Sequence, residues 1–172
     1  MNLTIPTLET ERLILRGPVV DDFDSYADIF ASPRSSYMGG PYSRDRAWQE
    51  FAADNIGWIL HGFGYWTVTD KETDSYIGAV GMANPPSYPE RELGWMLHPN
   101  CEGKGYAREA AIAARNHAYK GWSWSTVVSY VDPENARSIR LAERLGCAVD
   151  TDAKAPDAGD LVYRHPSPEA LI

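Results

Sequence analysis

The sequence has little cysteine, no long apolar run and fewer basic than acidic residues, and each shortage excludes a class of protein. Its two cysteines, Cys101 and Cys147, form no short-spaced pair, which argues against a cysteine-held metal or redox site. No apolar stretch approaches the roughly 20 residues that a membrane span needs. The start, MNLTIPTLETERL, lacks the basic region and apolar run of a secretory signal. We therefore expect a cytoplasmic protein with no membrane partner.

The charge balance argues against a nucleic-acid partner. Sixteen Lys and Arg residues against 24 Asp and Glu give a formal net charge of −8. A nucleic-acid binder derives much of its affinity from neutralising phosphates, which an acidic surface opposes. The acidity is compatible with a cationic substrate such as an amine, although surface acidity usually serves only solubility. Any anionic ligand must be held by a local site.

The length and the periodicity of apolar residues predict one domain of the α/β or α+β class. A chain of 172 residues suffices for a single domain spanning 1–172. The patterns predict strands at 11–17, 64–70, 75–82, 91–97, 125–131, 147–150 and 161–165. They predict helices at 21–30, after an N-cap at Ser43, from Gly103 to about Lys120, and at 133–146. This order indicates a mixed sheet with helices on its faces.

A glycine-rich loop separates the strand at 91–97 from the third helix. Gly103 and Gly105 flank Lys104 just before an alanine-rich pattern. A turn that enters a helix leaves backbone N–H groups unpaired, and the helix dipole adds about half a positive charge there. Lys104 and Arg108 would add to that charge. The loop matches neither a Walker motif nor G-x-G-x-x-G, so it is either a phosphate site of another kind or a flexible turn.

Two longer stretches resemble motifs of a known family. ELGWMLHPNCEGKGYAREA resembles the acetyl-CoA-binding motif of the GNAT superfamily of N-acetyltransferases, and DPENARSIRLAERLGC resembles that family's next motif. The N-x-x-S spacing and TERLILR are most similar to the branch of ribosomal-protein-alanine acetyltransferases. The resemblance runs from about residue 8 to 165. It implies a mostly antiparallel sheet of six to seven strands, about four flanking helices, and two central parallel strands that splay apart.

The resemblance also implies acetyl-CoA as cofactor and assigns its contacts. Backbone groups of Trp95, Met96 and Leu97 would contact the pantetheine arm, and Asn135 and Ser138 would lie beside the cofactor. The diphosphate would be bound by the loop and first helical turn, namely Glu102, Gly103, Lys104, Gly105, Tyr106, Ala107 and Arg108. Glu102 departs from the family pattern, which has Gln or Arg at that position.

Acetyl transfer to an amine needs a base and a group that stabilises the leaving thiolate. We favour Glu92 as the base, and the alternative is a surface carboxylate paired with Arg91 or another neighbour. Glu90, on a proline-rich loop, is a weaker candidate. Many relatives have a tyrosine acid where this chain has Ala142. Ser138 would then donate a hydrogen bond to sulfur, or else be a small residue packed under the cofactor.

The acceptor would be a primary amine, either a protein N-terminus or a small molecule. By resemblance, its pocket would be shaped by Tyr37, Met38, Pro41 and Tyr42, and exposed aromatics there are also a candidate homodimer surface. The four histidines lack metal-ligand spacing, so no metal is expected. The sequence therefore predicts an acetyl-CoA-dependent N-acetyltransferase. A non-catalytic acyl-CoA sensor or scaffold and an antibiotic-modifying acetyltransferase remain as alternatives.

Overall fold

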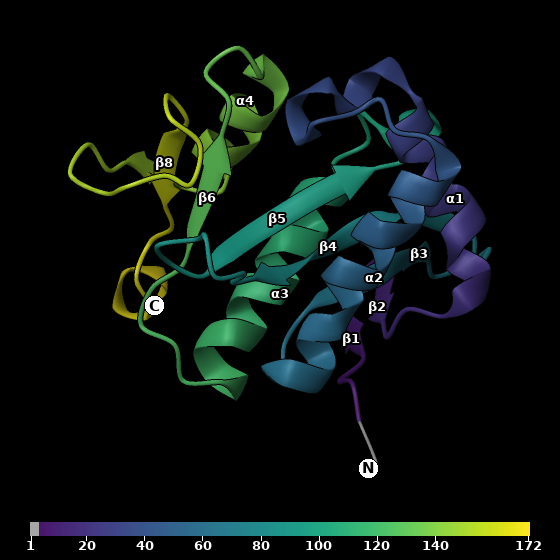
Figure 1. Cartoon of the computed structure of the whole chain (residues 1–172). Helices are drawn as coiled ribbons and strands as arrows, with labels where there is room; N and C mark the ends of the chain where they lie inside the picture. Colours follow the sequence, from purple (N-terminus) through teal and green to yellow (C-terminus); the bar gives the residue numbers. More distant parts are fainter. Residues whose placement is uncertain (1–3) are drawn as a thin grey trace.

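The computed structural model describes residues 4–172, which form a twisted sheet with helices on both faces (Figure 1). The strands are β1 (Leu8–Glu9), β2 (Leu13–Arg16), β3 (Tyr65–Asp70), β4 (Tyr76–Ala83), β5 (Glu92–Leu97), β6 (Val128–Val131), β7 (Ala148–Val149) and β8 (Leu161–Arg164). The α-helices are α1 (Phe23–Ala31), α2 (Arg44–Leu60), α3 (Tyr106–Gly121) and α4 (Ala136–Arg144). Short 3₁₀ turns span Val20–Asp22, Pro33–Met38, Pro99–Cys101 and Pro168–Leu171.

The sheet has the order β1-β2-β3-β4-β5-β6-β8-β7, and every neighbouring pair is antiparallel except β5 with β6. The predicted mixed, mostly antiparallel sheet with a central parallel pair is therefore confirmed. Its eight strands exceed the expected six to seven. The additional strand is β1, whose two residues are too few to give a period-2 pattern.

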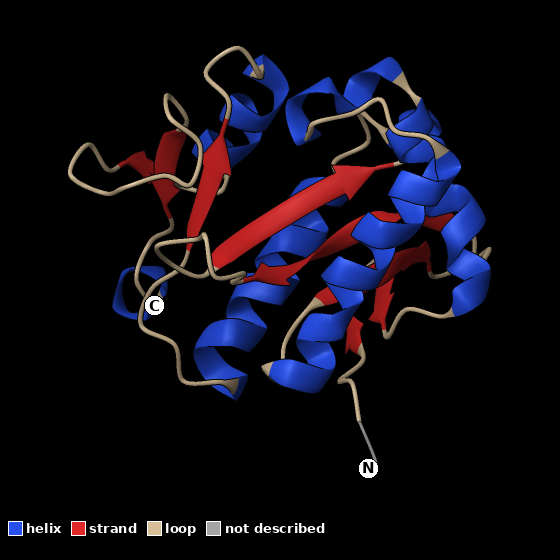
Figure 2. Ribbon diagram, in the orientation of Figure 1, coloured by secondary structure: helices blue, strands red, loops and turns tan. Residues whose placement is uncertain are grey.

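The helices cover the sheet in two layers (Figure 2). Helices α1 and α2 pack on one face, where Tyr65 and Ala79 join their apolar cluster. Helix α3 packs on the other face against Trp66 and Val68. This division follows from the pleat of the sheet, because successive residues of β3 point to opposite faces. Both faces are thus buried over the middle strands.

Two helix starts test the sequence-based boundaries. The predicted N-cap of α2 is confirmed, because the Ser43 hydroxyl accepts a hydrogen bond from the backbone N–H of Arg46 at 3.3 Å. The third helix was expected to start at Gly103, and that boundary is wrong: α3 begins at Tyr106. Gly103 and Gly105 have φ values of +76° and +82°, which are incompatible with a right-handed helix. Both glycines therefore belong to the loop.

The central parallel strands separate after one pair of residues. Glu92 pairs with Val128, and beyond this point β5 and β6 diverge toward their C-terminal ends (Figure 1). The predicted splay is confirmed. Among the described residues, no helix combines the length and apolar character required to cross a bilayer.

Candidate functional site

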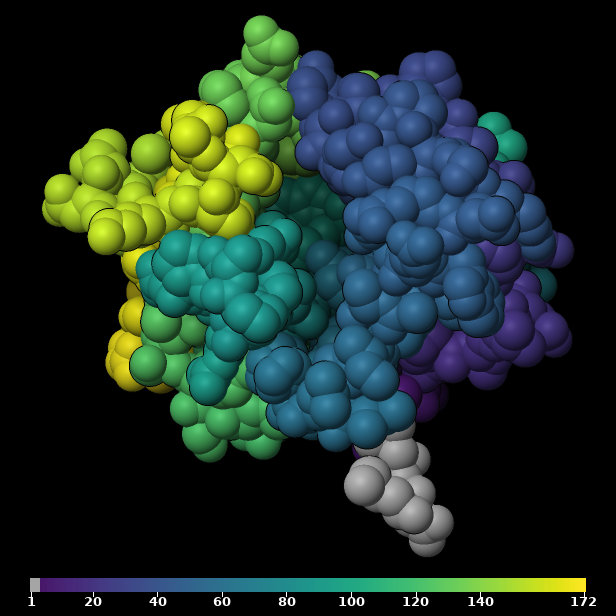
Figure 3. All heavy atoms as spheres, viewed as in Figure 1, coloured from purple at the N-terminus to yellow at the C-terminus, as the bar shows by residue number. Residues whose placement is uncertain are grey.

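A hollow opens on the face of the molecule that carries α2. Figure 3 shows it between the blue helix α2, the teal segment before β5, and the green-to-yellow C-terminal third of the chain. Teal atoms of the central sheet form its floor. The hollow therefore lies over the strands that diverge, where several segments distant in sequence meet.

The gap between β5 and β6 begins at a side-chain link. The backbone N–H of Val128 donates to the carbonyl of Arg91 at 3.2 Å, and the Ser129 hydroxyl donates to the carbonyl of Leu93 at 2.6 Å. After Leu93, the described part of β6 offers no ladder partner to β5. Backbone groups of Trp95, Met96 and Leu97 that face β6 therefore have no ladder partner on that strand, and their contact with a cofactor stays a prediction.

A buried relay holds Ser129 in place. Arg115 on α3 contacts Nδ1 of His165 at 3.4 Å, and Nε2 of His165 contacts the Ser129 hydroxyl at 3.0 Å. Arginine can only donate, so Nδ1 accepts, Nε2 carries the proton, and the serine proton points to Leu93. Burial and the nearby charge of Arg115 lower the pKa of His165 to about 3, which keeps the imidazole neutral. Sequence patterns did not reveal this relay, because its members come from three separate elements.

The glycine loop presents unpaired donors to solvent. Gly105 occupies the N-cap position of α3 without a capping side chain. No backbone N–H of residues 103–108 donates a hydrogen bond within the described chain, and the first that does is Glu109 N–H, to Gly105 at 3.1 Å. A Cβ placed on Gly103 would meet no atom within 4 Å, and one on Gly105 only the Arg12 guanidinium at 3.5 Å. The space above the loop is open to a ligand.

Arginines neutralise the acidic residue that departs from the family pattern. The Glu102 carboxylate pairs with Arg137 of α4 at 3.1 Å and also with Arg34 of the 3₁₀ turn Pro33–Met38. The charge of Glu102 is thus balanced before any diphosphate arrives. Sequence reasoning identified the departure but not its two partners, which lie far away along the chain.

Another arginine fixes the shape of the loop. Arg12, just before β2, donates to the carbonyl of Lys104 at 3.0 Å and forms an ion pair with Glu109 at 2.7 Å. The sequence predicts that Arg108 adds positive charge to the loop, but its side chain points elsewhere. Its Nε donates to the carbonyl of Arg144 at 3.2 Å, so this side chain reaches toward the end of α4.

Ser138 lies across the gap from β5 and contacts Trp95 of that strand. Asn135 caps α4 by accepting from the Ser138 backbone N–H at 3.2 Å. The Trp95 indole N–H donates to the Ser138 hydroxyl at 3.2 Å. Because indole nitrogen is only a donor, the serine proton remains available to another acceptor. Ala142, at the position where many relatives have tyrosine, is fully buried and faces the core.

Glu92 is a half-buried carboxylate without a basic partner among the described residues. The expected alternative, pairing with Arg91, is absent, because the Arg91 guanidinium lies over the Trp124 ring at 4.4 Å. Burial is the main cause that raises the pKa of Glu92 to about 8, and the negative charge of Asp54 adds to it. The opposing backbone N–H of Tyr130 is long, at 3.4 Å. Such a carboxylate can accept a proton at mildly alkaline pH, where it is ionised.

Glu90 is already engaged by a strong partner. Its two carboxylate oxygens accept hydrogen bonds from Arg164 at 2.8 and 2.9 Å, a bidentate geometry. Because Arg164 engages both oxygens of Glu90, this carboxylate is not available as the base.

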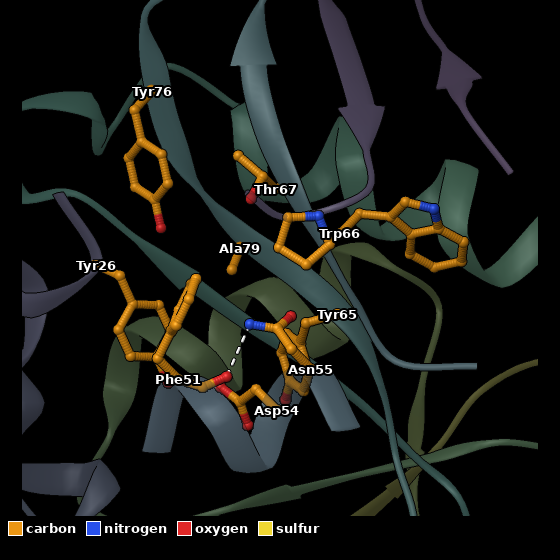
Figure 4. Close-up of a pocket in the computed structure, with 10 residues that line it drawn as sticks. Tyr26, Phe51, Asp54, Asn55, Tyr65, Trp66, Thr67, Tyr76 and Ala79 are labelled. Atoms are coloured by element: carbon orange, nitrogen blue, oxygen red, sulfur yellow. Dashed lines mark hydrogen bonds between the residues drawn. The ribbon is translucent and has the colours of Figure 1, made fainter. Parts of the chain in front are cut away.

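The four residues expected to shape the acceptor pocket lie between α1 and α2 along the chain. Tyr42 stacks on Phe30 with ring centroids 5.4 Å apart and donates to the carbonyl of Met38 at 3.2 Å. Tyr37 donates to the carbonyl of Glu134 at 3.2 Å, and Pro41 follows a cis peptide bond. None of these four side chains lines the pocket of Figure 4.

That pocket is lined instead by residues of α1, α2 and the sheet, which sequence reasoning missed. Figure 4 shows them: Tyr26, Phe51, Asp54, Asn55, Tyr65, Trp66, Thr67, Tyr76 and Ala79, with Pro18 completing the lining. One signal was present in the sequence, because Asp54 follows Phe51 by three positions and so shares the buried side of α2. No group of three potential metal ligands occurs among residues 4–172.

Comparison with known proteins gives a consistent picture. Residues 12–148 match a family model described as "Acetyltransferase (GNAT) domain". The crystal structure of an acetyltransferase from Agrobacterium tumefaciens str. C58 superposes with a TM-score of 0.91 and 44% identity, covering 96% of this chain and 97% of that one. The uncharacterized N-acetyltransferase p20 of Bacillus licheniformis is 32% identical over 146 residues, which are 81% of this chain and 80% of p20. YkkB of Bacillus subtilis is 32% identical over 90 residues, so the match spans about half of each protein (50% and 51%).

Proposed function

Because the chain belongs to the GNAT acetyltransferase family, we propose that it transfers the acetyl group of acetyl-CoA directly to a primary amine. The observation that carries this proposal is the coincidence of two features on one side of the sheet. One is the open glycine loop with unpaired donors at the start of α3, and the other is the gap between β5 and β6 with Ser138 at its edge.

The residues present fit a coenzyme A molecule. A diphosphate would accept hydrogen bonds from the N–H groups of residues 103–108, aided by the positive end of the 16-residue helix α3. The open space at Gly103 and Gly105 supports this placement, since a Cβ added to either would meet no atom closer than the Arg12 guanidinium at 3.5 Å. The pantetheine arm would pair with the free backbone of 95–97 in place of the missing strand. Asn135 would orient the start of α4 beside it.

The bound cofactor supplies an acetyl group as a thioester, and the chain supplies the rest. Glu92 accepts a proton from the acceptor ammonium, which frees the nitrogen lone pair for attack on the carbonyl carbon. A backbone N–H of 95–97 stabilises the oxyanion, and the Ser138 hydroxyl donates to the departing sulfur. In total an ammonium and a thioester become an amide, a thiol and one proton.

The structure supports Glu92 over other bases because its competitors have partners. Glu90 is held by Arg164, whereas Glu92 has no ion pair among the described residues and a pKa raised to about 8. That value is close to the roughly 7.7–8.0 of a free α-amine and below the ~10.4 of a lysine-like amine. Proton transfer at mildly alkaline pH is therefore accessible for both kinds of acceptor.

A screen of amines with acetyl-CoA tests the proposal. We expect thiol release that depends on both the enzyme and an amine, together with formation of the N-acetyl product by mass spectrometry. Binding of coenzyme A by calorimetry without thiol release from any amine would instead support the sensor alternative. Absence of both binding and release would reject the proposed function.

A further inference from the structure

One arginine on β8 binds side chains from three other segments of the chain. The guanidinium of Arg164 donates to the two carboxylate oxygens of Glu90 at 2.8 and 2.9 Å, to the Asp150 carboxylate at 2.7 Å and to the Thr126 hydroxyl at 2.8 Å. Each of its three nitrogens therefore has an acceptor within the chain. Arg164 and these three acceptors form what we call the Arg164 clamp. Because a guanidinium is planar and rigid, its bonds fix the accepting segments relative to one another.

Two of those segments form sides of the hollow in Figure 3. Glu90 belongs to the proline-rich stretch 84–91, which is the teal segment before β5. Asp150 begins the segment 150–160 between β7 and β8, in the C-terminal third of the chain that forms another side. Arg164 therefore joins two sides of the hollow that lie 60 residues apart in sequence (150 − 90 = 60).

The strand register puts Arg164 in one row with the proposed base. Glu92 of β5 pairs with Val128 of β6, and Val128 pairs with Arg164 of β8. Residues paired directly across a sheet point to the same face, so the arginine and the base share one face. Two strand spacings, roughly 10 Å, separate their backbones. Since both guanidinium ends are bound to Glu90 and Asp150, Arg164 acts on the surroundings of Glu92 and not on its carboxylate.

Tyr130 on β6 connects the clamp to the base. The backbone N–H of Glu90 donates to the Tyr130 hydroxyl at 3.1 Å, and the backbone N–H of Tyr130 donates to the Glu92 carboxylate at 3.4 Å. Arg164 thus holds the side chain of Glu90, while Tyr130 holds its main chain. Because Glu90 lies two residues before Glu92, a shift of Glu90 would displace the base as well.

The place of the clamp matters more than its energy. The side chains of Arg164, Glu90 and Asp150 are all partly exposed to solvent. Solvent screens ion pairs of this kind, so each adds little to the free energy of unfolding. A bidentate arginine–carboxylate pair nevertheless has a defined geometry. Removing the arginine should therefore loosen the sides of the hollow more than it weakens the fold.

We propose that Arg164 is a positioning residue for the amine acceptor. By holding the stretch 84–91 against the segment 150–160, it sets the width of the hollow beside Glu92 and hence where an amine lies relative to the base. The inference rests on the proposed function and adds a residue to it. Arg164 itself contacts only groups of the chain, so its effect on the reaction passes through Glu90 and Asp150.

Steady-state acetylation tests this role. Butylamine represents a small amine and alanyl-alanine amide a peptide N-terminus, and acetyl-CoA is varied separately. In Arg164→Gln we expect kcat/KM for the acetylated amine to fall about fivefold or more, as for coupled neighbours, while KM for acetyl-CoA stays within about twofold. The cofactor should be spared because the clamp has no member in the glycine loop. An unchanged kcat/KM for the amines would overturn the proposal.

Arg16→Gln is the matched control. Arg16 on β2 forms a similar bidentate pair with Asp22, at 2.7 and 2.9 Å, and its side chain is 30% exposed against 32% for Arg164. Strand β2 lies three strands from β5, on the side away from β8. Because Asp22 is buried, Arg16→Gln should lose at least as much stability in urea denaturation, yet keep kcat/KM for the amines. An equal fall of kcat/KM in both variants would mean that lost stability explains the effect, and would overturn the proposal.

A double-variant cycle tests whether Arg164 acts through Glu90. Glu90→Gln alone should lower kcat/KM for the amine less than Arg164→Gln does, because the bond to Asp150 remains. Added to Arg164→Gln, the same change should cause no further loss, since the contact is already absent. Fully additive losses would show that the two residues act independently, which contradicts a clamp.

Hydrogen exchange measures the clamp without catalysis. The backbone N–H groups of residues 152–153 donate to the Asp150 carboxylate at 3.2 Å, and that of Glu90 lies on the opposite side of the hollow. In Arg164→Gln the amides on both sides should exchange faster, because their local opening becomes easier. Arg16→Gln should leave them at the wild-type rate. Equal exchange in the wild type and Arg164→Gln would overturn the clamp.

The two measurements separate this proposal from the proposed function. Faster exchange in Arg164→Gln, with no acetylation of any amine by the wild type, would reject the acetyltransferase function and retain the link between the two sides of the hollow. Acetylation by the wild type with an unchanged kcat/KM in Arg164→Gln would reject the positioning role and retain the function.

Discussion

The hydroxyl of Ser129 lies 2.6 Å from the carbonyl of Leu93 and joins β5 to β6 at the point where their ladder ends. Because β6 turns away from β5 here, the Ser129 hydroxyl donates the hydrogen bond that a backbone N–H of β6 would otherwise donate. The Nε2–H of the neutral His165 imidazole donates a hydrogen bond to the Ser129 hydroxyl. The apex of the gap is therefore fixed by side chains.

Replacing Ser129 with alanine should leave the Leu93 carbonyl and the His165 N–H without partners. We expect a loss of about 1–3 kcal/mol in the free energy of unfolding, measured by urea denaturation. Coenzyme A affinity, measured by calorimetry, should fall as well, since the width of the gap would change. Ser125→Ala, at an exposed neighbouring position, is the control and should change neither quantity. Unaltered affinity in Ser129→Ala would mean that the link is only structural.

A leucine at Gly105 should harm cofactor binding far more than folding. Its φ of +82° makes any side chain strained by about 1–2 kcal/mol, and the side chain would project into the space assigned to the diphosphate. Gly62→Leu is a matched control, because Gly62 has φ +76°, no atom within 4 Å of an added Cβ, and a position just after α2. Both variants should lose similar stability, and only Gly105→Leu should lose affinity for coenzyme A. Equal affinities for the two variants would exclude the loop as the diphosphate site.

Glu92→Gln should lower turnover by about 10²–10⁴-fold, as loss of a general base does. The wild-type rate should rise with pH to a midpoint near the raised pKa of about 8, and the variant should lose that limb. Asp54 and Asp160 act on Glu92 as like charges, and Glu92 in turn helps to raise the pKa of Tyr65, Tyr88 and Tyr130. Wild-type rates across pH 6–10 in the variant would remove Glu92 as the base.

The raised pKa of Glu92 also predicts how the free energy of unfolding depends on pH. Its folded pKa of about 8 lies above its ordinary value of 4.5, so the folded state holds the proton more tightly than the unfolded state. The contribution of Glu92 to the free energy of unfolding is therefore most favourable below pH 4.5 and is lost as pH rises toward 8. Glu92→Gln should be more stable than the wild type at pH 9, with little difference at pH 4. Urea denaturation at both values measures this, and parallel curves would contradict the burial of an unpaired carboxylate.

Ser138→Ala should slow turnover about tenfold, the value of one ordinary hydrogen bond in the transition state. Coenzyme A affinity should stay within twofold, because the Asn135 cap uses the backbone N–H of residue 138 and not its side chain. Single-turnover kinetics and calorimetry separate the two effects. Normal turnover would return Ser138 to a packing role against Trp95.

Removing the charge of Glu102 should tighten cofactor binding. In Glu102→Gln the guanidinium groups of Arg34 and Arg137 lose their carboxylate partner and become available to a diphosphate. We expect an affinity about two- to fivefold higher at low salt, in keeping with the 0.2–1 kcal/mol of exposed ion pairs, and a smaller difference at high salt. Glu143→Gln, an exposed change on α4, serves as control. Weaker binding in Glu102→Gln would show that the carboxylate is needed to shape the loop.

The sequence by itself determined the order of the elements, the mixed sheet and the glycine loop. These depend on short-range patterns: alternating residues in β2, the cap at Ser43, and glycines where φ must be positive. Local patterns place an element correctly because neighbouring residues alone fix its period and its ends. The two-residue strand β1, the start of α3, both ends of α4 and the start of β6 escaped them.

Tertiary structure alone decided which carboxylate is free and what surrounds it. Glu90 and Glu92 are two residues apart, yet Arg164 engages the first and burial near Asp54 raises the pKa of the second. The partners of Glu102, the relay behind Ser129 and the pocket around Tyr65 likewise join residues tens of positions apart. Charge state and pocket chemistry depend on distance in space, and a single sequence shows only distance along the chain.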